Sequence, residues 1–186
     1  MKKVIFFSHN RHKINEISKL FKGSNINVLS LKNFININEP EETGSSFEEN
    51  AALKAREYSR LSGLPTLADD SGLEVGVLGG EPGILSSRYA GPGATDTERI
   101  AFLLQRLDNI PQEMWLARFR CAIAIVFPEQ QMEFYLGECR GRIISKPRGL
   151  NGFGYDPVFV PEGLDRTMAE LSAQEKNGVS HRSLAA

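Results

Sequence analysis

Two long β-type segments in the second half of the chain constrain its fold most. Residues 119–127 and 132–142 are strongly strand-like, and only the polar residues 128–131 separate them. Two such segments joined by so short a polar turn predict an antiparallel hairpin.

The first third of the chain alternates strand and helix patterns. Residues 3–8 contain a continuous apolar run that predicts a buried strand, and residues 14–21 place apolar side chains at helical spacing. Residues 26–31 predict a second strand. Residues 46–61 predict a second helix, because a serine and a glutamate at its start have the spacing of a capping box. Strand–helix alternation followed by a hairpin predicts an α/β fold with a mixed sheet.

Shorter elements are predicted between and after these segments. The sequence Asp69-Asp70-Ser71-Gly72 is interpreted as a tight acidic turn after a short strand, and Thr95 or Asp96 is expected to cap a third helix. Residues 158–160 predict a short strand and residues 169–176 a polar helix, with one more turn after Ser180.

Composition and charge exclude several classes of protein. The 186 residues are 41% hydrophobic and 24% charged, which favours one domain spanning 1–186, or two lobes that share one core. The longest apolar run, Cys121–Phe127, is too short to cross a membrane, and no charged-then-apolar leader precedes the first strand. A net charge of -1 gives no basic surface for nucleic acid. Two cysteines are expected to be buried thiols in a cytoplasmic protein.

The polar turn after the first strand is a candidate phosphate site. Backbone amides at a helix N-terminus, with Ser8, Asn10 and Lys13 beside them, are groups that bind phosphate. The turn lacks the glycine spacing of a P-loop or a dinucleotide fingerprint. An ordinary polar loop therefore remains the alternative.

Four acidic residues form a candidate metal site. Glu41 and Glu42 lie in one segment, and Asp69 and Asp70 in another. Carboxylates that are brought together repel each other, and a hard cation such as Mg²⁺ relieves that repulsion. One aspartate of the pair could also accept a proton from water. The alternative is two solvated acidic turns.

Three further groups of residues are candidates for binding a ligand. Asn50 and Lys54 share one helix face and could point at an anion, or could lie on a solvated face. Phe153, between two glycines and near Asp156, could present its ring to a flat ligand, or could be a turn residue packed on the core. The third group places cationic and hydrogen-bond-donating side chains near the chain end, at Lys176, His181 and Arg182.

Taken together and in this order, these segments resemble the inosine triphosphate pyrophosphatase family, the Ham1/RdgB-like purine nucleoside triphosphate pyrophosphatases. No single segment is decisive, but they follow the family pattern across nearly the whole chain. The matching segments are 8–13, 41–44, 47–51 with 54–55, 68–73, 82–83, 87–91, 152–157, and 175–176 with 180–182.

The resemblance implies an elongated α/β fold, with a long mixed sheet, flanking helices and two lobes around a central cleft. It implies Mg²⁺-dependent hydrolysis of ITP, dITP and XTP to the monophosphate and pyrophosphate by a homodimer. The alternatives are a Maf-like pyrophosphatase for other modified nucleotides and a nucleotide sensor that does not hydrolyse. Family members continue for another helix beyond Ser180-His181-Arg182, so the resemblance also implies that a terminal helix is missing here.

The resemblance also implies a role for each matching residue. Asp70 would bind Mg²⁺ and activate water, and either Glu41 or Glu42 would complete the metal site. Arg182 or His181 would face the 6-oxo group of the purine, which adenine lacks. The implied substrate-binding residues are Ser8, His9, Asn10, Arg11, His12, Lys13 and Lys54 for the triphosphate, Ser71 for the nucleotide, Phe153 and Gly154 at the base, and Tyr155, Asp156, Lys176, His181 and Arg182 for the base or sugar.

Overall fold

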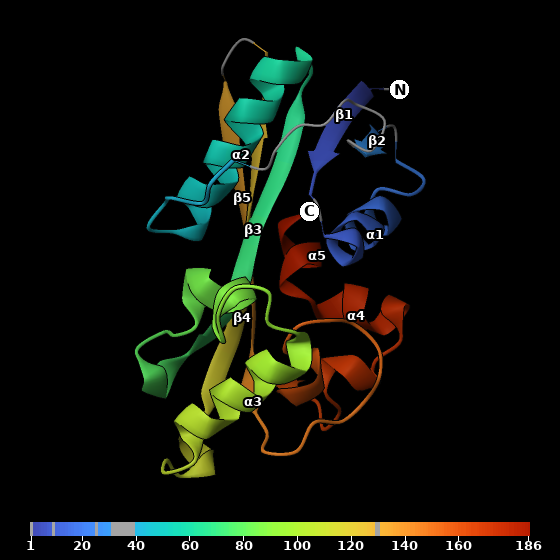
Figure 1. Ribbon diagram of the computed structural model, residues 1–186. Helices are drawn as coiled ribbons and strands as arrows, with labels where there is room; N and C mark the ends of the chain where they lie inside the picture. The colour runs from blue at the N-terminus through green and yellow to red at the C-terminus, as the bar shows by residue number, and fades with distance from the viewer. Residues whose placement is uncertain (1, 9, 25, 31–39, 129–130) are drawn as a thin grey trace. The chain divides into compact units, whose positions relative to one another are not determined.

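The computed structural model describes residues 2–8, 10–24, 26–30, 40–128 and 131–186. The strands are β1 (Lys2–Phe7), β2 (Ile26–Ser30), β3 (Thr66–Val75), β4 (Leu116–Val126), β5 (Met132–Ile143) and β6 (Phe159–Pro161). The α-helices are α1 (Arg11–Leu20), α2 (Phe47–Ser62), α3 (Asp96–Leu107), α4 (Ala173–Val179) and α5 (His181–Ala185) (Figure 1).

The described strands pair in the order β2-β1-β3-β4-β5-β6. β1 runs parallel to both β2 and β3, whereas β6 runs antiparallel to β5. At the hairpin between β4 and β5, the amide of Phe127 donates to the carbonyl of Gln131. The prediction of an α/β fold with a mixed sheet and a hairpin is confirmed.

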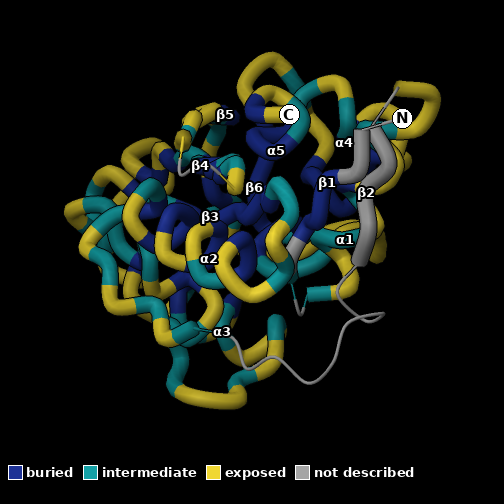
Figure 2. The backbone as a smooth tube through the Cα atoms, turned by 90° about the horizontal axis from the view of Figure 1, so that it is seen from above, coloured by how far each residue is buried: buried dark blue, intermediate teal, exposed yellow. Residues whose placement is uncertain are grey.

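The chain divides into two compact units. Unit 1 comprises Met1–Asp70, Cys121–Gly137 and Ala185–Ala186, and unit 2 comprises Ser71–Arg120 and Glu138–Leu184. Unit 1 has a core of aliphatic and aromatic residues on β1, α1, β3 and β4. In Figure 2, the dark blue colour of buried residues marks parts of β1 and β3. Unit 2 has its own core, in which α3 packs Ile100, Leu103 and Leu107.

Helix starts agree well with the sequence patterns. Ser46 caps α2 by accepting from the amide of Glu49, and Gly63 ends the helix at φ 65°, a conformation that glycine adopts without strain. The reciprocal half of the predicted capping box is wrong, because the Glu49 carboxylate accepts from Ser45 instead of Ser46. Thr95, rather than Asp96, caps α3 and forms a complete capping box with Glu98.

The predicted acidic turn at residues 69–72 is wrong. These residues lie inside β3, which continues unbroken to Val75. Acidic and glycine residues usually mark turns, but here lysine side chains compensate Asp69 and Asp70 inside the fold. Tertiary ion pairing has therefore overridden the local preference.

The C-terminal prediction needs a smaller correction. The predicted helix over 169–176 begins only at Ala173, because Met168–Glu170 is a 3₁₀ turn and Ser172 caps α4 with Glu175. The turn predicted after Ser180 is α5.

The two cysteines are buried free thiols, as predicted. Burial, with added repulsion from Asp156 and Glu138, raises the pKa of the Cys139 thiol to about 11. This thiol is therefore held in its unreactive protonated form at neutral pH.

Among the described residues, no helix has both the length and the apolar character that a membrane crossing requires.

Candidate active site

A buried lysine organises the charged cluster of unit 1. Lys54, on α2, places its Nζ 2.8 Å from Oε1 of Glu42 and 3.1 Å from Oδ1 of Asp70. Only 5% of its side chain is exposed. Burial opposes the charge of Lys54, but Asp70, Glu42 and Asp69 together raise its pKa above the ordinary value. Lys54 is therefore a permanent cation surrounded by carboxylates.

Asn50 orients the carboxylate of Asp70. It lies one helical turn before Lys54, and its Nδ2 donates to Oδ2 of Asp70 at 3.2 Å while its Oδ1 accepts from the amide of Gly44 at 2.8 Å. A Cβ at Gly44 would lie 2.6 Å from that Oδ1, so only glycine allows this approach. The sequence placed Asn50 and Lys54 on one face, but it did not indicate that Asn50 would hold a carboxylate.

Asp70 is a buried carboxylate whose charge is only partly compensated. Desolvation is the main effect and raises the pKa of Asp70, and Glu42 adds to that rise. The lysines Lys54 and Lys13 act in the opposite direction. A carboxylate with a raised pKa is a better proton acceptor than a free aspartate.

Lys13 and Asp69 form a second ion pair in unit 1. Nζ of Lys13 lies 3.1 Å from Oδ2 of Asp69, and 1% of the Asp69 side chain is exposed. Asp69 and Asp70 are successive residues of β3, so their side chains leave the strand in opposite directions. The two aspartates therefore have different lysine partners.

In the predicted phosphate turn, side chains of the turn itself accept hydrogen bonds from its backbone amides. Asn10 caps α1, and its Oδ1 accepts from the amides of His12 and Lys13. The Ser8 hydroxyl accepts from the amide of Asn10 at 3.1 Å. Arg11 and His12 are exposed, and His9 lies outside the described residues. Two amides of the expected backbone cradle are thus already used by Asn10.

The structure separates the two candidate glutamates. Glu42 is paired with Lys54, whereas Glu41 is exposed and only its carbonyl has a described contact, with the amide of Thr43. Of the two, Glu42 is the residue that lies beside Asp70 and Lys54.

An aromatic ring with two cations forms the second cluster, in unit 2. Nζ of Lys176 lies 5.0 Å from the centre of the Phe153 ring, and the guanidinium carbon of Arg182 lies 5.8 Å from it. Oδ2 of Asp156 accepts from Lys176 at 2.5 Å and from the amide of Phe153 at 2.9 Å. The half-buried ring is therefore held beside cations whose own positions are fixed.

Arg182 and His181 are buried parts of the same unit. Nη2 of Arg182 donates to the Ser71 hydroxyl at 2.7 Å, and Arg182 is 1% exposed. His181 stacks on Phe119 with ring centres 4.8 Å apart and an angle of 12° between the ring planes. Both orientations are set by residues distant in the chain.

Tyr155 and Gly154 support the loop that carries Phe153. Tyr155 is buried in the core of unit 2, and its hydroxyl donates to the carbonyl of Ser86 at 3.0 Å. The amide of Gly154 donates to Oδ2 of Asp96 at 2.7 Å. From the sequence, Asp96 was only a candidate helix cap, and its contact with the amide of Gly154 was not predicted.

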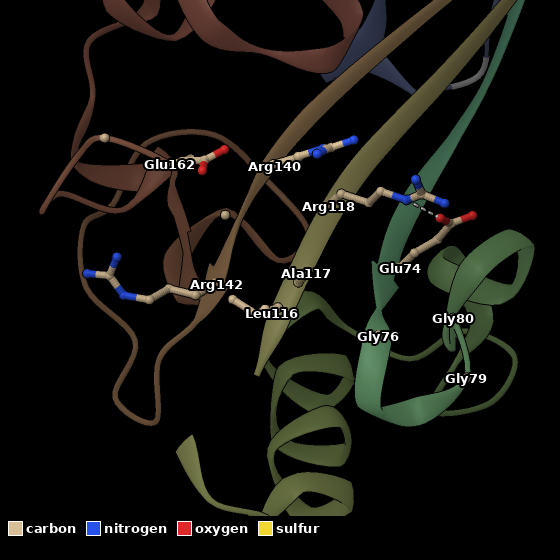
Figure 3. A pocket seen from close by; sticks show the side chains of 12 residues that line it. Glu74, Gly76, Gly79, Gly80, Leu116, Ala117, Arg118, Arg140, Arg142 and Glu162 are labelled. Atoms are coloured by element: carbon tan, nitrogen blue, oxygen red, sulfur yellow. Dashed lines mark hydrogen bonds and ion pairs between the residues drawn. The ribbon is translucent and has the colours of Figure 1, made fainter. Parts of the chain in front are cut away.

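A separate pocket in unit 2 contains none of the predicted site residues. It has a volume of about 680 Å³ and is lined by residues of β3, of the segment that follows β3, of β4 and β5, and of the loop after β6 (Figure 3). At its edge, Arg118 on β4 points toward Glu74 on the neighbouring strand β3 and donates to it at 2.6 Å, and Arg118 also donates to Glu138. Glutamates therefore balance the charge of Arg118.

The donor atoms of unit 1 suit a hard cation. Glu42 and Asp70 offer carboxylate oxygens, which Mg²⁺ prefers. Within the described ranges, no three His, Cys, Asp or Glu side chains form a group that could hold a metal by themselves.

Comparison with known proteins identifies the family. A dITP/XTP pyrophosphatase of Bacillus licheniformis is 46% identical over 182 residues, covering 98% of this chain and 93% of the relative. Another, from Geobacillus kaustophilus, is 45% identical over 185 residues and covers 100% and 91%. The solved structure of a HAM1 protein from Coxiella burnetii has a TM-score of 0.90 at 42% identity, covering 100% of this chain and 94% of that one. A model described as the Ham1 family matches residues 4–186, and this chain belongs to that family.

Proposed function

We propose that this protein hydrolyses non-standard purine nucleoside triphosphates (dITP, XTP and ITP) to the monophosphate and pyrophosphate. Relatives about 46% identical over nearly the whole chain carry the name dITP/XTP pyrophosphatase. The observation that carries the proposal is the buried cluster of Lys54, Asp70, Glu42 and Asn50. A sensor that only binds nucleotide has no need of a proton-accepting carboxylate held in this way.

Glu42 and Asp70 are the residues that we propose to hold Mg²⁺, together with the triphosphate. Their carboxylate oxygens fit this ion. When bound, Mg²⁺ would neutralise phosphate charge and polarise the bond between the α and β phosphates, which is the bond to be broken. Lys54 supplies a second positive charge beside the same carboxylates. Lys13 would contact phosphate oxygens, and in doing so it would either break its ion pair with Asp69 or keep that pair alongside the phosphate contact.

Asp70 is the proposed general base. As a buried carboxylate, it can accept the proton of the attacking water. Asn50 holds Oδ2, so the carboxylate has one fixed orientation before substrate arrives. Such preorganisation lowers the cost of reaching the transition state.

The cluster of unit 2 is the proposed base site. The Phe153 ring would stack on the purine, with Lys176 and Arg182 supplying donors beside it. A donor aimed at the 6-oxo group would reject adenine, because it would be left unpaired.

A panel of triphosphates tests the proposed function. The protein is incubated with dITP, XTP, ITP, dGTP and dATP in Mg²⁺ buffer, and pyrophosphate and orthophosphate are measured separately. We expect pyrophosphate as the product, with the oxopurine substrates dITP, XTP and ITP preferred. Orthophosphate as the main product, or equal rates with dATP and dITP, would contradict the proposal.

Replacing Phe153 by alanine tests the stacking role. We expect dITP binding to weaken by about 1–3 kcal/mol, the range measured for base–aromatic stacking. Isothermal titration calorimetry without divalent metal measures this change. The control is Phe134→Ala, which removes an aromatic side chain of unit 1 that is 46% exposed. Equal dITP affinity in the wild type and in Phe153→Ala would mean that the ring serves the fold alone.

The remaining implications of the family resemblance stay predictions. They are assembly as a homodimer, action in the cytoplasm, a single functional domain over 1–186, and triphosphate contacts by residues 8–13.

A further inference from the structure

Residues 152–156 form the loop that carries Phe153, here called the aromatic loop. Two successive backbone amides of this loop each donate to a different carboxylate. The amide of Phe153 donates to Asp156 at 2.9 Å, and the amide of Gly154 donates to Asp96 at 2.7 Å. Asp156 belongs to the loop itself, whereas Asp96 is the first residue of α3. One of the two anchors thus comes from 58 residues away in the sequence.

The backbone around Phe153 depends on these anchors. Gly152 and Gly154, which flank the ring, have φ values of 76° and 62°, where glycine is favoured because it has no side chain to clash. Two glycines give the segment many conformations in the absence of other contacts. The hydrogen bonds to Asp96 and Asp156 select one of them and so set the direction of the ring.

Asp96 is itself fixed in position. Its Oδ1 pairs with Arg99, one helical turn further along α3, which leaves Oδ2 for Gly154. Arg99 also donates to the carbonyls of Ser87 at 2.9 Å and Ala94 at 2.5 Å. A guanidinium with three partners is a rigid support for the carboxylate.

Capping of α3 does not require Asp96. Thr95 accepts from the amide of Glu98, and Glu98 accepts from the amide of Thr95, which completes the capping box. One oxygen of the Asp96 carboxylate accepts from the aromatic loop, and the other pairs with Arg99 of its own helix. Helix capping and the loop contact can therefore be separated by mutation.

We propose that Asp96 is a positioning residue for base recognition, which holds Phe153 in the direction needed to stack on the purine. The inference rests on the proposed function, in which Phe153 contacts the base. Asp96 acts through the amide of Gly154, and Arg99 holds Asp96 in place.

The test compares Asp96→Ala with Asp96→Asn. In Asp96→Ala we expect the KM for dITP, and its metal-free Kd, to rise about tenfold, with kcat within about twofold of wild type, because part of the stacking energy is lost. Asparagine keeps one oxygen, which can accept from Gly154 or from Arg99 but not from both. Asp96→Asn should therefore recover only part of the lost affinity.

Glu98→Ala is the matched control. It breaks the capping box on the same helix turn but has no described contact with the aromatic loop. We expect its melting temperature to fall while the KM and Kd for dITP stay within about twofold of wild type. An Asp96→Ala variant with unchanged Kd, or an equal rise in the control, would overturn the positioning role.

The metal-free Kd separates this inference from the proposed function. A wild-type protein that releases no pyrophosphate from any triphosphate would overturn the proposed hydrolysis. The Kd comparison between the three variants would still decide whether Asp96 positions the ring.

Discussion

Replacing Asp70 by asparagine is expected to slow pyrophosphate release from dITP by about 10²–10⁴-fold, the range associated with loss of a general base. Asparagine has nearly the same shape but cannot take up the water proton. Lys54 keeps Glu42 as a partner, so the variant should fold. Steady-state kinetics with Mg²⁺ gives the rate, and calorimetry should show that dITP still binds.

Asp69→Asn is the matched comparison for this experiment. Asp69 is the neighbouring buried carboxylate, but it leaves β3 in the opposite direction and pairs with Lys13. We expect it to lose far less activity than Asp70→Asn. Near wild-type turnover in Asp70→Asn, or equal losses in both variants, would remove the general-base role from Asp70.

Replacing Lys54 by methionine is expected to lower the free energy of unfolding by about 3–5 kcal/mol, the usual result of removing one partner of a buried ion pair. Methionine fills a similar volume, so the loss would come from Asp70 and Glu42, which would remain without their cation. Urea unfolding followed by far-ultraviolet circular dichroism, which reports on the helices of both units, measures the change. Hydrolysis should fall as well, because the proposed phosphate contact is lost.

Two further variants distinguish charge compensation from a general effect of mutation. Arg60→Met removes an exposed cation from the same helix, where it pairs with Glu57, and should leave stability unchanged. The double variant Lys54→Met with Asp70→Asn should be more stable than Lys54→Met alone, since one uncompensated charge has been removed. A double variant that shows the sum of both losses would argue against this ion-pair account.

The fold followed from local patterns wherever neighbouring residues controlled the structure. The serine and glutamate near the start of α2, and the cap candidates before α3, predicted where these two helices begin to within one or two residues. The acidic residues of β3 were predicted wrongly as a turn. Their lysine partners come from α1 and α2, and no local pattern reports such distant charge compensation.

Within the candidate site, the sequence indicated residue types better than their roles. Lys54, Asp70 and Glu42 were all singled out, and they lie within one cluster. The sequence left open whether Asn50 faces an anion or lies on a solvated face, and the structure shows it buried and donating to Asp70. The resemblance implied that Tyr155 contacts the base or sugar, which stays a prediction, and the structure adds that its hydroxyl donates to the carbonyl of Ser86. A polar side chain can face a ligand or a neighbour, and the packing of other elements decides between them.

By itself, the sequence determined the order of the main strands and helices, the Ser46 cap of α2 and the membership of the Ham1 family, because these depend on residues near one another or on motifs along the chain. Only the tertiary structure decided that Glu42 rather than Glu41 pairs with Lys54, and that Asp96 holds the amide beside Phe153. Hydrogen bonds and ion pairs act over about 3 Å in space. Residues 58 positions apart can therefore meet without leaving any periodic mark in the sequence.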